Sequence, residues 1–531
     1  MDTTERKCFL LLALLVLVTA WNSYDFYEYD EHFQIIEFGG SKLGIVPTQN
    51  LPWEYEAGIR PWLQPVLFAG LCKILQFSGI TDRFLWTFFF RLFCAAWGFY
   101  AMLCVYRMGA APWRRPIKNQ HAFNSKPSYR PAAWMKDAPA RRNHLLLCTT
   151  LGFMPFLLVR TSSENMSTSF FTIGMVLLLK NHYGSDSSRR TVSPGIWLLS
   201  GLMLGLAFQF RYQTIIMTGG LCLWLLFIAG TRWKYIGLIV GGFLLSTGIG
   251  LMADRYGNGR GTFPFFDYFR INLLENKTAD FGADPFFAYF YLPLANVFAP
   301  IVLVLLVSLL ILWIQKPGHA LTWITLPFFV FHCFIGHKEE RFLFPLIPAA
   351  ILSLQFIFIQ DGRQVLPAFL QTGFWRGARK WLWRYNWCWL IFLSVFPFNI
   401  DFNINHQKFI YDRREEVDTY YAVDFDPYRR KELVFSFYRP DNLRIVETGN
   451  LKSMADIAWD NSAREIYFFA RMPYLDDWPD DLARRTTVVN SSHFFFRRPW
   501  VVKKSTPVLK YIDGRIDDVR CPTLFRIAPQ G

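Results

Sequence analysis

The sequence predicts an α-helical membrane protein with many transmembrane spans, followed by a smaller water-soluble part. Hydrophobic residues make up 52% of the 531 residues and charged residues only 18%, whereas soluble domains carry about 25% charge. Apolar runs long enough to cross a bilayer recur from residue 8 to about residue 398 and then stop. We therefore expect a multi-span membrane domain over residues 1–400 and a soluble domain over residues 401–531.

Twelve apolar stretches are candidates for transmembrane helices, and the charged loops between them decide which ones cross. The stretches lie at about 8–22, 63–80, 84–106, 143–160, 165–180, 194–210, 213–230, 235–252, 292–314, 319–336, 342–360 and 381–398. The loop 107–142 carries nine basic residues against the single acid Asp137, which predicts a cytoplasmic loop. Arg6 and Lys7 place the N-terminus on the same side, so an even number of crossings separates the two.

The stretch 63–80 is the weakest of the three candidates that precede this loop. It contains Gln64, Pro65, Lys73 and Gln76, and the last two fall on one helical face, which is typical of an amphipathic helix at the membrane interface. Leaving this stretch out gives about eleven transmembrane helices and places the C-terminal part on the outer side. Its short apolar runs between Pro, Asp and Asn turns, Leu433–Phe437 among them, predict a small α+β domain there.

The net charge of +15 lies almost entirely on the membrane part. Residues 401–531 contain 21 Lys and Arg against 20 Asp and Glu, which leaves +14 on the first 400 residues. There the basic residues gather in loops between spans, as expected for cytoplasmic loops and not for a nucleic-acid groove. The nine cysteines show no CxxC or His/Cys ligand spacing, so we expect neither a zinc site nor a disulfide framework.

Under this topology the polar segments gather at the outer face of the membrane. They are Asp30–Glu31, Arg160–Asn165, Gln209–Gln213, the loop 253–291 and His337–Arg341. Ionisable residues near the membrane are costly unless paired, and they mark functional sites by default. Anchoring does not require them to share one face, so we expect a polar site there.

The first outer loop, residues 23–62, offers carboxylates close to the membrane. Glu37 lies near Asp30 and Gln34 on the surface of a helix, and Glu31 follows Asp30 directly. A carboxylate in this position can accept a proton from an attacking hydroxyl group. An acidic helix start that complements the helix dipole fits the same residues equally well.

The second half of this loop mixes aromatic rings with charge, in Trp53, Glu54 and Arg60. Aromatic surfaces suit sugars and isoprenoid chains, although tryptophans are also common in the aromatic belts of membrane proteins.

Five consecutive titratable residues, His337–Arg341, separate two apolar runs. Lys338 and Arg341 can neutralise a phosphate, the arginine in a bidentate manner, and His337 can donate to a phosphate oxygen. The chain has neither a DxD pair placed as a nucleotide-sugar clamp nor a P-loop, so the pattern favours a lipid phosphate. The plainer alternative is a charged anchor at the interface.

These motifs together resemble those of the polyprenyl-phosphate-mannose-dependent mannosyltransferases. The segments that carry the resemblance are H-K-E-E-R-F-L-F-P at 337–345, D-E-H-F-Q at 30–34, P-W-E-Y at 52–55, the R-T-S-S-E-N segment at 160–165 and F-Q-F-R at 208–211. The family often has proline before its D-E pair, where this chain has Tyr29. The segment 281–289 resembles a family motif in which both histidines and both tryptophans are replaced here.

The resemblance implies a GT-C membrane fold and an inverting transfer that yields an α-mannoside. Asp30 would be the general base, with Glu31 second, and Gln34, Glu37, Trp53, Glu54 and Arg60 would line the substrate. His337, Lys338 and Arg341, assisted by Arg211, would bind the phosphate of the donor. The family makes N-glycan precursors and GPI anchors from a lipid-linked sugar donor and a glycan or glycolipid acceptor, without an obligatory metal or other cofactor.

Three alternatives stay open from the sequence. The first is a GT-C enzyme for another polyprenyl-phosphate sugar, which fits the same motifs. The second is a lipid-carrier transporter, which would need polar residues spread through its spans. The third is a binding domain on a passive membrane anchor, although eleven spans exceed what an anchor requires. The membrane is that of the endoplasmic reticulum in a eukaryote or the plasma membrane in a bacterium, with the site lumenal or periplasmic. We expect an integral membrane monomer.

Overall fold

The structure is a computed structural model. It describes residues 2–24, 26–109, 114–116, 129–131, 138–184, 193–259, 263–275, 277, 280, 282–292, 298–357, 359–360, 363–364, 372–395, 403–423, 435–461, 463–470, 479–491 and 523–529.

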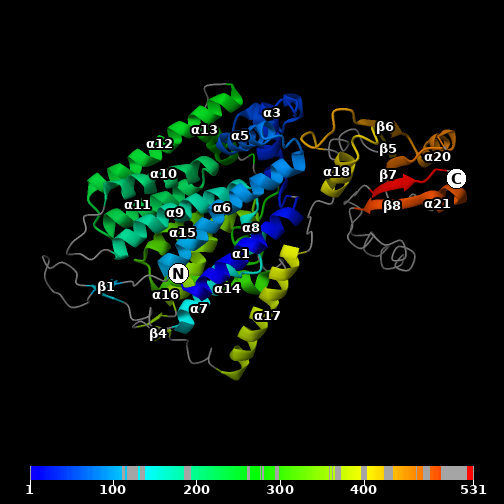
Figure 1. Cartoon of the computed structure of the whole chain (residues 1–531). Helices are drawn as coiled ribbons and strands as arrows, with labels where there is room; N and C mark the ends of the chain where they lie inside the picture. Colours follow the sequence, from blue (N-terminus) through cyan, green and yellow to red (C-terminus); the bar gives the residue numbers. More distant parts are fainter. Residues whose placement is uncertain are drawn as a thin grey trace.

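A bundle of helices makes up the larger part of the molecule (Figure 1). The long helices are α1 (Thr3–Asn22), α6 (Arg83–Gly109), α9 (Ser163–Gly184), α10 (Pro194–Phe210), α11 (Thr214–Phe227), α12 (Trp233–Asn258), α14 (Ala299–Gln315), α15 (Ala320–Phe334) and α17 (Gly373–Val395). The other α-helices of the bundle are α2 (Tyr29–Glu31), α3 (Phe38–Lys42), α4 (Trp53–Ala57), α5 (Leu63–Phe77), α7 (Ala138–Thr149), α8 (Met154–Leu158), α13 (Pro264–Phe269) and α16 (Ile347–Ile357). The 3₁₀ and π segments are η1 (His32–Glu37), η2 (Thr48–Asn50), η4 (Arg270–Leu274), η6 (Ala288–Phe290) and η8 (Glu340–Leu346).

Glycines allow the central helices to pack with their backbones in contact. A Cβ atom on Gly201 of α10 would lie 2.0 Å from the carbonyl oxygen of Ile239 in α12, and one on Gly242 would lie 2.1 Å from that of Leu198. Close backbone approach through small residues is the usual way in which membrane helices associate. The α10–α12 pair thus fixes the part of the bundle from which Arg211 emerges, directly after α10.

Each predicted apolar stretch contains helical residues, so the helical fold is confirmed. Two stretches are not single helices: 143–160 divides into α7 and α8, and 342–360 begins as η8 before α16. Pro345 lies within η8 and has no amide proton to donate, which disfavours a continuous α-helix there.

Among the described helices, α6 and α12 are each long and apolar enough to cross a membrane. The helices α14 and α15 pass the same criteria only together, and they are bent by 116° at the break between them. The count of eleven crossings therefore stays a prediction.

The C-terminal part contains a five-stranded mixed sheet beside one end of the bundle (Figure 1). Its strands are β5 (Thr419–Val423), β6 (Arg444–Thr448), β7 (Ile466–Ala470), β8 (Thr486–Ser491) and β9 (Thr523–Ile527), in the order β6-β5-β7-β9-β8. Strands β5, β6 and β7 run parallel, and β9 is antiparallel to β7 and β8. The accompanying helices are α18 (Asn403–Asp412), α20 (Leu451–Asp460) and α21 (Asp480–Arg485), and two short strand pairs, β1 (Arg114–Pro116) with β2 (Tyr129–Pro131) and β3 (Ile359–Gln360) with β4 (Arg363–Gln364), lie elsewhere in the chain.

One predicted apolar run of this domain does not join the sheet. In Leu433–Phe437, the residues from 435 onward form a turn, and Phe435 and Phe437 belong to the hydrophobic core of the helical bundle. Residues 433 and 434 lie outside the described part of the chain. The division into domains at residue 400 stays a prediction.

Candidate active site

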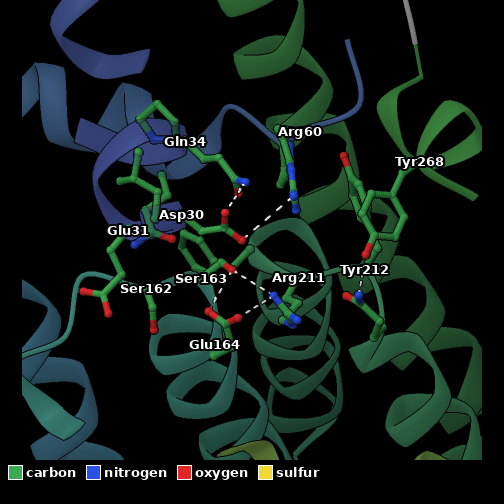
Figure 2. A pocket seen from close by; sticks show the side chains of 16 residues that line it. Asp30, Glu31, Gln34, Arg60, Ser162, Ser163, Glu164, Arg211, Tyr212 and Tyr268 are labelled. Atoms are coloured by element: carbon green, nitrogen blue, oxygen red, sulfur yellow. Dashed lines mark hydrogen bonds and ion pairs between the residues drawn. The ribbon is translucent and has the colours of Figure 1, made fainter. Parts of the chain in front are cut away.

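The acidic motif of the first loop forms a short helical turn, α2, that continues into the π-helix η1. Asp30 lies on α2 and Gln34 on η1, and the Gln34 Nε2 donates to the Asp30 Oδ1 over 2.6 Å. Single π turns are frequent at functional sites because they change the direction in which side chains project. Here both side chains line the same polar pocket (Figure 2).

This polar pocket is open to solvent, with about 530 Å³ of space within and in front of it, and is formed by segments far apart in the sequence. It is lined by Asp30, Glu31, Gln34, Ile35, Arg60, Pro61, Gln64, Pro65, Ser162, Ser163, Glu164, Phe210, Arg211, Tyr212, Gln213 and Tyr268. Three of the five polar segments predicted to share one membrane face therefore meet here, and Tyr268 adds a fourth from the loop 253–291.

Asp30 is the carboxylate that combines access to the pocket with cationic partners. Its Oδ2 lies 2.8 Å from the Arg341 Nη2 and 4.0 Å from the Arg60 Nη2, and its side chain is 34% exposed. Burial raises the pKa of Asp30, but the charges of Arg341 and Arg60 outweigh it and hold the pKa below its ordinary value. The carboxylate is therefore ionised at neutral pH and can accept a proton.

Two buried arginines share the carboxylate of Glu164. Its Oε1 lies 2.7 Å from the Arg211 Nη1 and 3.5 Å from the Arg341 Nη1. The Nε and the Nη2 of Arg341 also donate hydrogen bonds to the Glu339 carboxylate, the latter at 3.0 Å. Within the described part of the chain, the Arg341 Nη1 and the Arg211 Nε are buried without a hydrogen-bond acceptor.

Glu31 lines the pocket, but its carboxylate accepts hydrogen bonds from backbone amides. Its Oε2 accepts from the amide of Thr161 at 3.2 Å and from the Thr161 hydroxyl at 3.4 Å, and its Oε1 accepts from the amide of Tyr27 at 3.3 Å. Its carboxylate points away from Asp30 in Figure 2. Burial raises the pKa of Glu31 despite the nearby Arg160, and the residue ties the acidic turn to the start of α9.

The predicted substrate-lining residues divide into two groups. Glu54 is buried and accepts from the Gln34 Nε2 at 3.2 Å, and it lies 3.4 Å from the Arg60 Nη2, so it positions two pocket residues. Glu37 and Trp53 do not line the pocket. Glu37 is buried against the His32 Nε2 at 3.3 Å, because the wider π-helical turn of η1 rotates it away from the face expected for an α-helix. Trp53 is exposed.

Two of the predicted phosphate ligands are also engaged elsewhere. The buried Lys338 ammonium donates to the carbonyl oxygens of Asp284 at 3.1 Å and Ile335 at 2.6 Å. The His337 Nε2 lies 2.9 Å from the Glu339 Oε1. Neither residue lines the polar pocket, whereas Arg60 and Arg211 do. Arg341 contacts two of the lining residues, Asp30 and Glu164.

The residue-level predictions omitted Glu164, Ser163, Tyr212 and Tyr268. Glu164 links the two arginines, and Tyr212 and Tyr268 form the wall opposite the acidic turn. Their segments were recognised as polar ends of apolar runs, and that position was the available signal. A pattern of polar and apolar residues along the chain does not show which side chains from distant segments pair with one another.

An apolar groove of about 970 Å³ is formed by residues that neighbour those of the polar pocket. Tyr27, Arg160 and Glu340 lie at its polar edge, each within a few residues of Asp30, Ser162 or Arg341. The remaining lining comes from α8, η6, α14, η8 and α16: Phe153, Phe156, Leu157, Tyr289, Phe298, Val302, Leu305, Leu306, Leu309, Leu343, Phe344, Leu346, Ile347 and Ala350.

A family model described as the Alg9-like mannosyltransferase family matches residues 7–419. The chain belongs to this family. The match includes the acidic turn, the pocket arginines and η8, and the resemblance derived from the motifs is thereby confirmed.

Curated relatives of this Alg9-like chain come from several eukaryotes. GPI mannosyltransferase 3 of Yarrowia lipolytica is 25% identical over 64% of this chain and 59% of its own length. The probable Dol-P-Man:Man(7)GlcNAc(2)-PP-Dol alpha-1,6-mannosyltransferase of Schizosaccharomyces pombe is 30% identical over 66% of this chain and 57% of its own length. The chain thus spans less than two thirds of the length of the curated relatives it matches.

Among solved structures, ArnT from Cupriavidus metallidurans bound to undecaprenyl phosphate resembles this Alg9-like chain over the full length of both, with a TM-score of 0.51 and 13% identity. At this identity the likeness concerns the fold alone. It supports the predicted helical GT-C architecture.

Proposed function

We propose that this Alg9-like chain transfers mannose from polyprenyl-phosphate-mannose to a hydroxyl group of a lipid-linked glycan, with inversion to an α-mannoside. The observation that carries the proposal is the ionised Asp30, held 2.8 Å from Arg341 in the wall of a polar pocket. Membership in a mannosyltransferase family and the printed names of the relatives support the sugar and the lipid-linked acceptor.

Asp30 is the proposed general base. The acceptor hydroxyl attacks the anomeric carbon, a new C–O bond forms on the face opposite the phosphate, and the hydroxyl proton passes to the Asp30 carboxylate. The bond between the anomeric carbon and the phosphate oxygen breaks, and its electron pair leaves with the polyprenyl phosphate. The charges of Arg341 and Arg60 keep the Asp30 carboxylate ionised at neutral pH, which is the state that a general base requires.

Arg341 and Arg211 are the proposed ligands of the departing phosphate. The Arg211 Nε is a buried donor without an acceptor in the described chain, and the Arg341 Nη1 has only an ion-pair contact, at 3.5 Å, with Glu164. Preorganised donors stabilise charge that develops in the transition state. Arg341 also touches Asp30, so one guanidinium links the base to the leaving group. His337 and Lys338, held by Glu339 and by backbone carbonyls, stabilise the η8 segment that presents Arg341.

The apolar groove is the proposed site of the donor's polyprenyl chain. Its walls are almost wholly hydrocarbon, and its polar edge at Tyr27, Arg160 and Glu340 lies beside segments that also line the polar pocket. A polyprenyl phosphate bound there would direct its phosphate toward the arginines.

The proposal extends to the membrane. Eleven crossings would place the pocket on the lumenal side of the endoplasmic reticulum, since the curated relatives named above are eukaryotic. The enzyme is proposed to act as a monomer, with the lipid-linked donor as its one sugar source and no further cofactor.

The test is a transfer assay in membranes that contain the full chain, with polyprenyl-phosphate-mannose and a panel of mannose-containing glycolipids. Transfer by the wild type and its loss in Asp30→Asn are expected. Glu56→Gln is the matched control, since Glu56 is an exposed carboxylate of the same loop. Use of another polyprenyl-phosphate sugar with mannose refused would overturn the assignment of the sugar.

A further inference from the structure

Four residues of the C-terminal part, Phe435, Ser436, Phe437 and Tyr438, insert into the helical bundle behind the acidic turn. We call them the aromatic clamp. All three aromatic side chains are at most 2% exposed, and they belong to the core of the bundle although they lie between strands β5 and β6 in sequence.

Phe435 packs against the rear of the acidic turn. Its ring centroid lies 4.5 Å from that of His32 and 5.3 Å from that of Phe33. Tyr438 stacks on the same histidine at 5.7 Å. Asp30 and Gln34 line the polar pocket, whereas His32 does not and is buried against the clamp.

The clamp contacts the same outer loop at two later points. A Cβ atom on Gly40 of α3 would lie 2.8 Å from both the Phe437 Cδ2 and the Val46 Cγ2, so these two side chains fill the space left by this glycine. The Asn50 Nδ2 donates to the Ser436 Oγ over 3.2 Å. Three successive parts of the loop, η1, α3 and η2, therefore contact four consecutive residues.

The clamp is itself fixed to the bundle on its other side. Tyr438 stacks on Phe84 with centroids 4.2 Å apart, and its hydroxyl lies 3.2 Å from the Thr87 Oγ1. The Arg83 Nη1 donates to the carbonyl oxygen of Phe437 at 3.1 Å. The clamp therefore packs against the start of α6.

A separate support is required because the helical segment that carries Asp30 is marginal on its own. It runs through α2, η1 and α3 from Tyr29 to Lys42, with a π-helical part in the middle, and isolated helices shorter than about 15 residues are marginal in water. The position of the Asp30 carboxylate therefore depends on packing behind it as well as on Arg341 in front.

We propose that the aromatic clamp is a positioning element of the active site, through which the C-terminal part holds Asp30 in line for catalysis. The inference rests on the proposed function for Asp30. Phe435 is its principal residue and acts through His32 without touching the substrate.

The test compares Phe435→Ala with Phe435→Leu and with Trp459→Ala, a control at an exposed aromatic residue of α20. In the full chain in detergent, hydrogen exchange of peptides from 29–42 should rise in Phe435→Ala, while peptides from α9 stay as in the wild type. In membranes, kcat should fall by about 100-fold, the loss typical of a displaced catalytic group, with little change in the KM for the donor. Phe435→Leu should restore both readouts, and the Trp459→Ala control should change neither.

A folded Phe435→Ala protein with unchanged exchange at 29–42 would overturn the proposal, as would a rise of equal size in α9. If the wild type transfers no sugar, the proposed function fails, and the exchange measurement still decides whether the clamp holds the turn.

Discussion

The Arg341 Nη2 lies 2.8 Å from the Asp30 Oδ2, although 311 positions separate the two residues in the chain. The contact joins the acidic motif of the first loop to the charged motif between α15 and α16. It places the proposed base and the proposed phosphate ligand in one ion pair, so a change at either residue alters the other.

Arg341→Lys should strongly reduce transfer, although the variant keeps the positive charge. Lysine keeps the charge but cannot contact Asp30, Glu339 and Glu164 with a planar set of donors. We expect kcat to fall by about 100-fold, as for the loss of a preorganised transition-state donor. Steady-state kinetics of transfer measure it, and near-normal kcat in Arg341→Lys would show that geometry at this guanidinium is dispensable.

Glu164→Gln should destabilise the protein in the absence of donor lipid. The carboxylate is 1% exposed and lies between two arginines, and removal of one partner of a buried ion pair costs about 3 kcal/mol or more. Added polyprenyl phosphate should raise the unfolding temperature of Glu164→Gln more than that of the wild type, because the phosphate replaces the lost negative charge. Equal shifts in a thermal-unfolding assay would separate Glu164 from the phosphate site.

Val302→Trp should fill the apolar groove and discriminate between donors by chain length. Val302 lines the groove, whereas Val307 on the same helix does not and is exposed. The KM for a long-chain polyprenyl-phosphate-mannose should rise in Val302→Trp, with a smaller effect on a short-chain donor and no effect in Val307→Trp. Identical KM changes for both chain lengths would argue against the groove as the lipid site.

Glu28 predicts a pH dependence of stability. Burial, reinforced by neighbouring carboxylates and opposed by Arg341, raises the pKa of Glu28 from its ordinary 4.5 to about 7. A raised pKa in the folded state means that the contribution of Glu28 is fully present below pH 4.5 and is lost as the pH rises toward 7 and beyond. The unfolding temperature of Glu28→Gln relative to the wild type should therefore increase between pH 5 and pH 8, and a constant difference would contradict this.

The sequence could supply the helical class, the family and the two motifs that meet at the site. The match of H-K-E-E-R and D-E-H-F-Q to family motifs identified Asp30 and Arg341, because short catalytic motifs are local in sequence. The sequence pattern could not show that Glu164 pairs with Arg211 and Arg341, since that pairing depends on how α9 packs against the end of α10 and against η8.

Two further differences have local causes. Glu37 was expected beside Asp30 because an α-helical spacing was assumed, whereas η1 is a π-helix and turns Glu37 toward His32. Lys338 was expected to face a phosphate. Its ammonium group instead donates to the carbonyl oxygen of Ile335, just after α15, and to that of Asp284. The sequence pattern of charged and apolar residues does not distinguish a lysine that binds a ligand from one that donates hydrogen bonds to backbone carbonyl groups.

The most direct test of the account compares Asp30→Asn with Glu56→Gln in membranes supplied with polyprenyl-phosphate-mannose and glycolipid acceptors. Both variants should insert into the membrane as the wild type does. Asp30→Asn should lose transfer by at least about 100-fold, the lower end of what a general base contributes, while Glu56→Gln keeps it. Wild-type transfer that persists in Asp30→Asn would contradict the assignment of the base and, with it, the account of the pocket.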